Sequence, residues 1–162
     1  MEFSLSEEQK LIIDTTKKFV ETELFPHEDL VEKTGNLPLD LIKEIQLKAI
    51  NTGIYAANIP QEYGGGGLDT LTWLLYEKEL GKANYALHWT CVARPSNILC
   101  AGTNEQKEKY LPKLATGEIM GCFGLTEPDH GSNPSGMISN FKSDGDDVIL
   151  NGSKMWISNS PF

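Results

Sequence analysis

The hydrophobic pattern of this chain changes its period near Gly117, and this change limits the folds that the chain can adopt. Before that point, apolar residues recur at the three- and four-residue spacing of amphipathic α-helices. After it, short β-prone runs and alternating apolar and polar residues are typical of strands. Helices followed by strands, without alternation of the two, indicate an α+β fold and not a doubly wound sheet.

Helices are expected throughout the first part of the chain, and several have signals at their ends. Ser6 and Gln9 form a capping-box pattern, Pro38 suits a first helical position, and Asp69 can cap a later run. The apolar periodicity predicts helices over about residues 7–26, 38–50, 70–80, 84–101 and 104–115. Within 84–101, Pro95 is expected to bend the helix or to delay its start.

Four consecutive glycines, residues 64–67, separate two of the expected helices. Such a run can act as a flexible hinge or let the backbone approach a ligand, because glycine has no side chain. The composition favours a simple connector. The glycines do not alternate with other residues between a strand and a helix, so they form no dinucleotide-binding fingerprint.

Short strands are expected after Gly117. Strands are expected over residues 119–126, 137–142 and 148–150, and a turn over residues 143–146 separates the last two. Asn151-Gly152 is a two-residue hairpin signal that leads into another expected strand over 154–158. So few strands leave sheet edges unpaired. We therefore expect a helical domain over 1–117 and the incomplete beginning of a β-domain over 118–162.

The composition excludes several classes of protein. The 162 residues include 14 Lys and Arg against 23 Asp and Glu, a net charge of −9, so the chain lacks the cations that a nucleic-acid partner requires. Hydrophobic residues make up 40%, yet no apolar run approaches the roughly 18 residues that span a bilayer. No export signal is recognisable, and the three cysteines form no metal-ligand pattern. These features predict a reduced, cytoplasmic protein without a metal.

Two segments in the second part contain groups suited to ligand binding. In residues 121–133, a loop with Gly131 and Ser132 can direct backbone N–H groups and a hydroxyl at an anion. Farther on, Trp156 and Ser158 are expected to project from the same face of a strand. An indole beside a hydroxyl is a suitable wall for a planar heteroaromatic cofactor, although each pattern alone is more often turn chemistry or core packing.

Leu125-Thr126-Glu127-Pro128 with Gly131-Ser132, followed by Lys154-Met155-Trp156-Ile157-Ser158-Asn159, resembles the flavin-binding signature of the acyl-CoA dehydrogenase family. The resemblance extends in family order along nearly the whole chain, through the sequences IPQEYGG at 59–65, GTNEQK at 102–107 and KYLPKL at 109–114. Residues 122–128 and 156–161 are most similar to the glutaryl-CoA dehydrogenase branch.

This resemblance implies N-terminal helices, a central β-domain and a C-terminal four-helix bundle, usually assembled as a homotetramer. It implies FAD as the cofactor and an acyl-CoA thioester as the substrate. A carboxylate removes the proton at Cα while the hydride at Cβ passes to flavin N5, and an electron-transfer flavoprotein usually reoxidises the flavin.

The resemblance also assigns residues to the site. Residues 123–126 would line the isoalloxazine ring, with Thr126 at its edge. Trp156 would pack on the flavin, and Ser158 would offer a hydroxyl near N5 or O4. The implied cofactor-binding residues are Phe123, Gly124, Leu125, Thr126, Gly131, Ser132, Trp156, Ile157 and Ser158. The implied substrate-binding residues are Ser132, beside the pantetheine arm and the pyrophosphate, and Arg94, which would pair with the carboxylate of a diacid.

Two positions depart from the family pattern. Many relatives have Thr where this chain has Ser158, so the hydroxyl is kept and a methyl group is lost. Relatives commonly have Asp where this chain has Asn133, which removes a charge from the loop.

The family's catalytic base is a glutamate of the C-terminal helical domain, expected beyond Phe162, so no catalytic residue is expected in this chain. Residues 1–162 alone are expected to be inactive and to bind FAD weakly. Glu127 is interpreted as a structural acceptor, His130 as an exposed loop residue and His88 as a surface or satisfied core residue.

Three alternatives stay open at this point. The same fold could support a glutaryl-CoA-type dehydrogenase, or a flavin monooxygenase or acyl-CoA oxidase that lets oxygen reach the reduced flavin. The chain could also be a truncated, non-enzymatic helical module that contacts partner subunits through exposed apolar faces.

Overall fold

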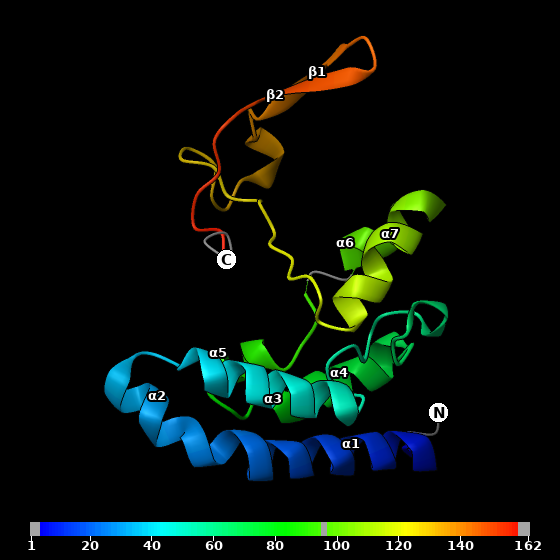
Figure 1. Ribbon diagram of the computed structural model, residues 1–162, viewed down its shortest axis with the longest axis vertical. Coiled ribbons are helices and arrows are strands. Elements are labelled where there is room, and N and C mark those ends of the chain that lie inside the picture. The colour runs from blue at the N-terminus through cyan, green and yellow to red at the C-terminus, as the bar shows by residue number, and fades with distance from the viewer. Residues whose placement is uncertain (1–3, 95–96, 159–162) are drawn as a thin grey trace. The chain divides into compact units, whose positions relative to one another are not determined.

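The computed structural model describes residues 4–94 and 97–158, which form two compact units, Met1–Ile119 and Met120–Phe162. The described α-helices of the first unit are α1 (Glu7–Phe19), α2 (Glu28–Thr34), α3 (Leu39–Asn51), α4 (Thr70–Leu80), α5 (Tyr85–Thr90), α6 (Asn97–Cys100) and α7 (Asn104–Ala115). The second unit contains the antiparallel strands β1 (Asn140–Asp144) and β2 (Asp147–Asn151) (Figure 1). The predicted α+β class is confirmed.

The chain stays helical beyond the predicted end of its first helix. The capping box is confirmed, because Ser6 Oγ accepts the N–H of Gln9 at 3.1 Å and Gln9 Oε1 accepts the N–H of Ser6 at 3.0 Å. A π-helical turn, η1 (Val20–Leu24), and a 3-10 turn, η2 (Phe25–His27), then lead into α2. Pro26 fits in the first turn of η2, where its missing N–H is tolerated, so it does not stop the chain.

The single helix predicted over residues 84–101 is wrong. Asn84 Oδ1 accepts the N–H of Ala86 at 2.9 Å and starts α5, which ends at Thr90, and α6 forms separately. The N–H of Ala93 donates to the Tyr55 carbonyl oxygen at 2.7 Å. This bond holds the chain against another segment, so the α5 helix does not continue. Pro95, which we expected to bend the helix, lies outside the described residues.

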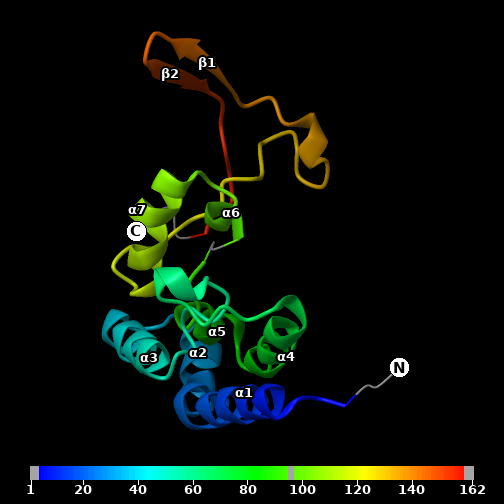
Figure 2. The same ribbon diagram turned by 90° about the vertical axis from the view of Figure 1, so that its right-hand side faces the viewer.

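The core of the first unit lies among its helices. α1 packs against α4, α3 against α5, and α6 against α7 (Figure 2). The largest fully buried apolar side chains are Leu24, Ile45, Ile59, Leu80, Leu87, Leu111, Leu114 and Val20. Tyr76 is also buried, and its hydroxyl donates to the Ile54 carbonyl oxygen at 2.8 Å, so its polar end is satisfied. Among the described residues, no helix combines the length and hydrophobicity that crossing a bilayer requires.

The second unit forms fewer strands than the sequence predicted. β1 pairs with β2 in the register Phe141 opposite Leu150, and Gly145, at a φ of 63°, occupies the first position of the two-residue turn. The strand expected at 119–126 is wrong, because those residues have no strand partner among the described residues. The hairpin expected at Asn151-Gly152 is also wrong. Gly152 instead lets the backbone pass Ser139, whose Oγ lies 2.1 Å from the position of an added Cβ.

The run of four glycines is fastened to the segment before it. The N–H groups of Gly65, Gly66 and Gly67 donate to the carbonyl oxygens of Pro60 (3.2 Å), Ala56 (3.0 Å) and Ile59 (2.9 Å), respectively. A Cβ added to Gly65 would lie 2.0 Å from the Ile59 carbonyl oxygen. The glycines thus allow two stretches of backbone to touch, and they are not a free hinge.

We expect Gly65→Ala to destabilise the protein by about 3 kcal/mol or more, because backbone must move to admit the new methyl group. Gly53→Ala is the matched control, since Gly53 has a φ of 76° but nothing within 4 Å of an added Cβ. Gly53→Ala should lower the free energy of unfolding by about 1 kcal/mol, which is the cost of placing alanine in the left-handed backbone conformation alone. Urea unfolding followed by circular dichroism measures both, and equal losses would contradict the close packing.

Candidate functional site

The two segments that the sequence indicated for ligand binding are hydrogen-bonded to each other in the second unit. The N–H of Met155 donates to the Thr126 carbonyl oxygen at 3.0 Å. The Lys154 ammonium donates to the Leu125 carbonyl oxygen at 3.1 Å. Thr126 therefore lies beside the residue that directly precedes Trp156.

The expectation that residues 154–158 form a strand, with Trp156 and Ser158 on one face, is wrong. These residues belong to no strand, and Trp156 has a φ of 59°, in the left-handed region that a bulky side chain rarely adopts. The bonds of Lys154 and Met155 to residues 125–126 hold the chain immediately before Trp156, and the backbone turns there.

The residues around this contact expose apolar surface beside polar donors. The Trp156 side chain is 83% exposed and Phe123 is 50% exposed. Gly124 and Ser158 are also exposed, whereas Leu125, Thr126 and Ile157 are half-buried. Trp156 and Phe123 thus offer exposed aromatic surface within three sequence positions of the Ser158 and Thr126 hydroxyls, and a planar ring with polar atoms along one edge can use both kinds of group.

Gly131 and Ser132 follow a tight turn. Glu127 and His130 exchange backbone hydrogen bonds of 3.2 Å in both directions, which closes the turn over the two residues between them. Both Gly131 and Ser132 are exposed, and nothing lies within 4 Å of a Cβ added to Gly131. A ligand can therefore approach the backbone here. His130 is half-buried, not fully exposed as we expected.

Glu127 is the buried polar centre of the second unit, with 2% of its surface exposed. Its Oε2 accepts the N–H of Ile138 at 2.8 Å, and its Oε1 accepts the N–H of Ser139 at 3.0 Å and the Lys154 ammonium at 2.9 Å. Ser139, Lys154 and the Ile138 N–H, in that order, favour the carboxylate and lower the pKa of Glu127 to about 2. The interpretation of Glu127 as a structural acceptor is confirmed.

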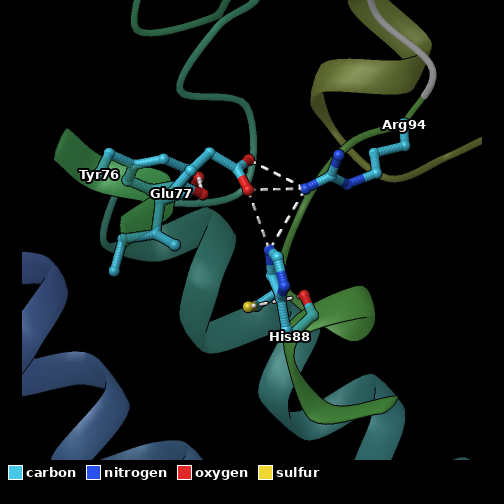
Figure 3. A network of polar contacts seen from close by, with 6 residues as sticks. Tyr76, Glu77, His88 and Arg94 are labelled. Atoms are coloured by element: carbon cyan, nitrogen blue, oxygen red, sulfur yellow. Dashed lines mark hydrogen bonds and ion pairs between the residues drawn. The ribbon is translucent and has the colours of Figure 1, made fainter. Parts of the chain in front are cut away.

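Arg94 lies in a polar network of the first unit (Figure 3), whereas the residues described above belong to the second unit. Its Nη2 donates to Glu77 Oε1 at 2.9 Å and Oε2 at 3.0 Å, and it lies 3.2 Å from His88 Nε2. The guanidinium also lies over the Trp89 ring, 5.4 Å from its centroid. Its Nε is buried without a hydrogen-bond partner among the described residues.

Glu77 neutralises Arg94 and contacts His88, whose Nε2 lies 3.3 Å from Glu77 Oε2. Burial tends to raise the pKa of Glu77, but the hydrogen bond with His88 and the charge of Arg94 outweigh it and lower the pKa. His88 is thus a satisfied core residue, as the sequence suggested. The Cys91 thiol nearby donates to the His88 carbonyl oxygen, and burial raises the pKa of this thiol to about 12.

Sequence reasoning missed the roles of Glu77 and Lys154. Glu77 lies within a helix and carries no local signal of its partner, which is distant in sequence. Lys154 directly precedes an apolar and aromatic run, where a lysine tends to be partly buried and then needs an acidic partner. This position in the sequence could have indicated that Lys154 forms an ion pair. Among the described residues, no group of three or more His, Cys, Asp or Glu side chains could hold a metal ion.

Comparison with known proteins shows the family to which the chain belongs. The chain matches the N-terminal domain of acyl-CoA dehydrogenases over residues 6–118 and the middle domain of acyl-CoA dehydrogenases over residues 122–162. It is 36% identical to the probable acyl-CoA dehydrogenase YngJ of Bacillus subtilis over 168 residues, covering 100% of this chain and 43% of that relative.

Two solved structures have a similar fold. A glutaryl-CoA dehydrogenase from Mycobacterium smegmatis in complex with FADH2 is 37% identical, with a TM-score of 0.78 over 94% of this chain and 39% of that chain. A structure described as the electron transferring flavoprotein of Acidaminococcus fermentans is 36% identical, with a TM-score of 0.81 over 99% of this chain and 42% of that chain. This chain thus spans less than half the length of each.

The Glu127 carboxylate makes the second unit sensitive to acid. Its pKa of about 2 lies below the ordinary value near 4.5, so its stabilising effect is complete above pH 4.5 and is lost as the pH falls toward 2. We expect the amide resonances of Ile138 and Ser139, which donate to it, to move cooperatively over this range in selectively 15N-labelled protein. Glu127→Gln should abolish the transition, whereas Asp146→Asn, which removes a carboxylate from the turn between β1 and β2, should leave it intact. A transition that persists in Glu127→Gln would contradict this assignment.

Proposed function

Because the chain belongs to the acyl-CoA dehydrogenase family, we propose that it is part of an FAD-dependent enzyme that dehydrogenates an acyl-CoA thioester between Cα and Cβ. The observation that supports this most directly is the hydrogen bond between Met155 and Thr126. It brings together the two segments in which the family's flavin-binding motifs lie, and both carry exposed groups that suit a flavin.

We propose that the isoalloxazine ring lies against residues 123–126 and 156–158. The Thr126 and Ser158 hydroxyls would donate to polar atoms of the ring, while Trp156 and Phe123 would cover apolar surface. Gly131 and Ser132 would hold the pyrophosphate, with Ser132 also beside the pantetheine arm of the substrate. The fit is supported by the exposure of Trp156 and by the open space at Gly131.

When bound, FAD would supply an acceptor for the hydride from Cβ, and the substrate would become a 2,3-enoyl-CoA once the proton at Cα is removed. Glu127 is unsuited to removing that proton. Its carboxylate is buried, accepts three hydrogen bonds and has a pKa of about 2, far below that of an effective general base near neutral pH. We therefore propose that the base comes from outside residues 1–162.

The remaining parts of this proposal concern the protein in its natural length. The relatives that this chain matches are more than twice as long, so we propose that the complete protein also has a C-terminal helical domain. From the family resemblance we propose that it assembles as a homotetramer. An electron-transfer flavoprotein is the proposed electron acceptor, because such a protein usually reoxidises the flavin in the family to which the chain belongs. A cytoplasmic location is proposed from the three free cysteines.

Removal of either hydroxyl should weaken the flavin site without unfolding the protein. We expect Thr126→Val and Ser158→Ala to lower kcat about tenfold, the effect of losing ~1.4 kcal/mol of transition-state stabilisation, and to shift the flavin absorbance bands. Ser153→Ala removes an exposed hydroxyl from the segment that contains Ser158 and should change neither kcat nor the flavin absorbance. The assay is dye-linked dehydrogenation by the protein in its natural length, with residues 1–162 expected to show no turnover.

The outcomes of that assay separate the alternatives. A colourless protein that binds no FAD would contradict the proposal and favour a non-enzymatic module. Rapid oxygen consumption coupled to acyl-CoA oxidation would favour an oxidase or monooxygenase on the same fold. Turnover by residues 1–162 alone would contradict the placement of the base outside this segment.

Arg94 is the proposed contact for a substrate that carries a second carboxylate, as glutaryl-CoA does. Its side chain is 30% exposed and its Nε is unpartnered among the described residues, although Glu77 already binds Nη2. We expect Arg94→Lys, which keeps the charge near Glu77 but loses the planar fork, to lower kcat/KM for glutaryl-CoA about tenfold, or ~1.4 kcal/mol. Butyryl-, isovaleryl- and octanoyl-CoA should be unaffected. Equal changes for all four substrates would contradict a role in carboxylate recognition.

A further inference from the structure

Lys154 connects three segments of the second unit through a single ammonium group. Its Nζ lies 3.1 Å from the Leu125 carbonyl oxygen, 2.9 Å from Glu127 Oε1 and 3.3 Å from the Met137 sulfur. The next residue, Met155, donates its N–H to Thr126. The neighbouring residues Lys154 and Met155 thus bind the three consecutive residues 125–127.

Glu127 extends this connection to the start of the hairpin. Its carboxylate accepts the Ile138 and Ser139 N–H groups just before β1 as well as the Lys154 ammonium. The Glu127 side chain is only 2% exposed, whereas that of Lys154 is 30% exposed, so the carboxylate is withdrawn from water while the ammonium keeps partial access to it. Such charge-assisted bonds are stronger than neutral ones, and loss of Lys154 leaves the Glu127 carboxylate without its counter-charge in a buried position.

The ion pair lies immediately beside the residues proposed to bind the flavin. Thr126 directly precedes Glu127, and Trp156 follows Lys154 by two positions. Trp156 adopts a left-handed φ of 59°, which costs about 1–3 kcal/mol and persists only where the surroundings hold it. The bonds made by Lys154 and Met155 are the described contacts that hold the chain directly before this residue.

We propose that the Glu127–Lys154 ion pair is a positioning clamp for the flavin site, which fixes Thr126 relative to Trp156 and Ser158 before the cofactor binds. This inference rests on the proposed function. Neither residue touches the flavin in this proposal; they act through Thr126 and Trp156. If the ion pair already holds these segments in place, FAD binding does not have to order them. Loss of the ion pair should therefore chiefly raise the dissociation constant for FAD.

The test compares Lys154→Met with Lys142→Met in the protein in its natural length. Lys142 lies exposed on β1 and forms no ion pair among the described residues, so its variant removes the same charge from the same unit. We expect Lys154→Met to raise the dissociation constant for FAD at least tenfold, or ~1.4 kcal/mol, and to blur the vibronic structure of the flavin absorbance. The FAD dissociation constant of Lys142→Met should stay within about twofold of the wild-type value, and Lys154→Arg should bind FAD more tightly than Lys154→Met.

A second readout needs no cofactor. In the apoprotein, the Met155 amide should lose its protection from hydrogen exchange in Lys154→Met and keep it in Lys142→Met, because its bond to Thr126 depends on the clamp. Failure of the wild-type protein to bind FAD would overturn the proposed function, and this readout would still test the preordering. Unchanged protection in Lys154→Met would overturn the clamp, as would lost protection with unchanged FAD affinity.

A double-mutant cycle addresses the case in which a single variant unfolds. Glu127→Gln with Lys154→Met leaves no unpaired charge, so the double variant should fold even where one single variant does not. Where both single variants fold, we expect the FAD dissociation constant of the double variant to match that of the weaker-binding single variant, because both changes remove one interaction. Where one of them unfolds, the double variant should still bind FAD at least tenfold more weakly than the wild-type protein. Losses that multiply across the two sites, or wild-type affinity in the double variant, would overturn the clamp.

Discussion

A carboxylate that is withdrawn from water must find bonds within the protein, and the arrangement of the second unit depends on how Glu127 meets this requirement. Two backbone N–H groups before β1 and the Lys154 ammonium all converge on it. Because the two N–H groups and the ammonium come from two different stretches of chain, one side chain sets the mutual positions of the loop after Thr126, the hairpin and the segment before Trp156. The described residues of this unit form only two paired strands and bury little apolar surface, so hydrogen bonds and an ion pair at Glu127 hold its segments together in place of a hydrophobic core.

The first unit combines both kinds of stabilisation. Its helices enclose a continuous apolar core, and at one side of that core Glu77 of α4 is bonded to Arg94 and to His88 of α5 (Figure 3). The charges of Glu77 and Arg94 compensate each other, so Arg94 can remain partly buried while its Nε stays without a partner among the described residues. A polar network next to packed helices fixes the chain after α5, the same region where the Ala93–Tyr55 bond draws it away from the helix axis.

Much of the helical architecture follows from local chemistry. Ser6, Asp69 and Thr103 each accept backbone N–H groups at a helix start, and such caps depend on residues three or fewer positions apart. The end of α5 could not be predicted in this way, because the bond that accompanies it comes from Tyr55, far away in sequence. Similarly, Pro26 is a frequent helix breaker, but its place in the first turn of η2 made it harmless.

The sequence alone was sufficient to determine that helices precede strands, where most helices begin, and which two motifs belong to a flavin-binding family. Only the tertiary structure decided that Trp156 turns into the left-handed region, that Gly65 lies against Ile59, and that Lys154 and Glu127 join the two motifs. The physical reason is the range of the interactions. Caps and hydrophobic periods are satisfied within a few residues, whereas the partner of a buried charge, or the backbone that a glycine touches, is supplied by whichever distant segment the complete fold brings to it.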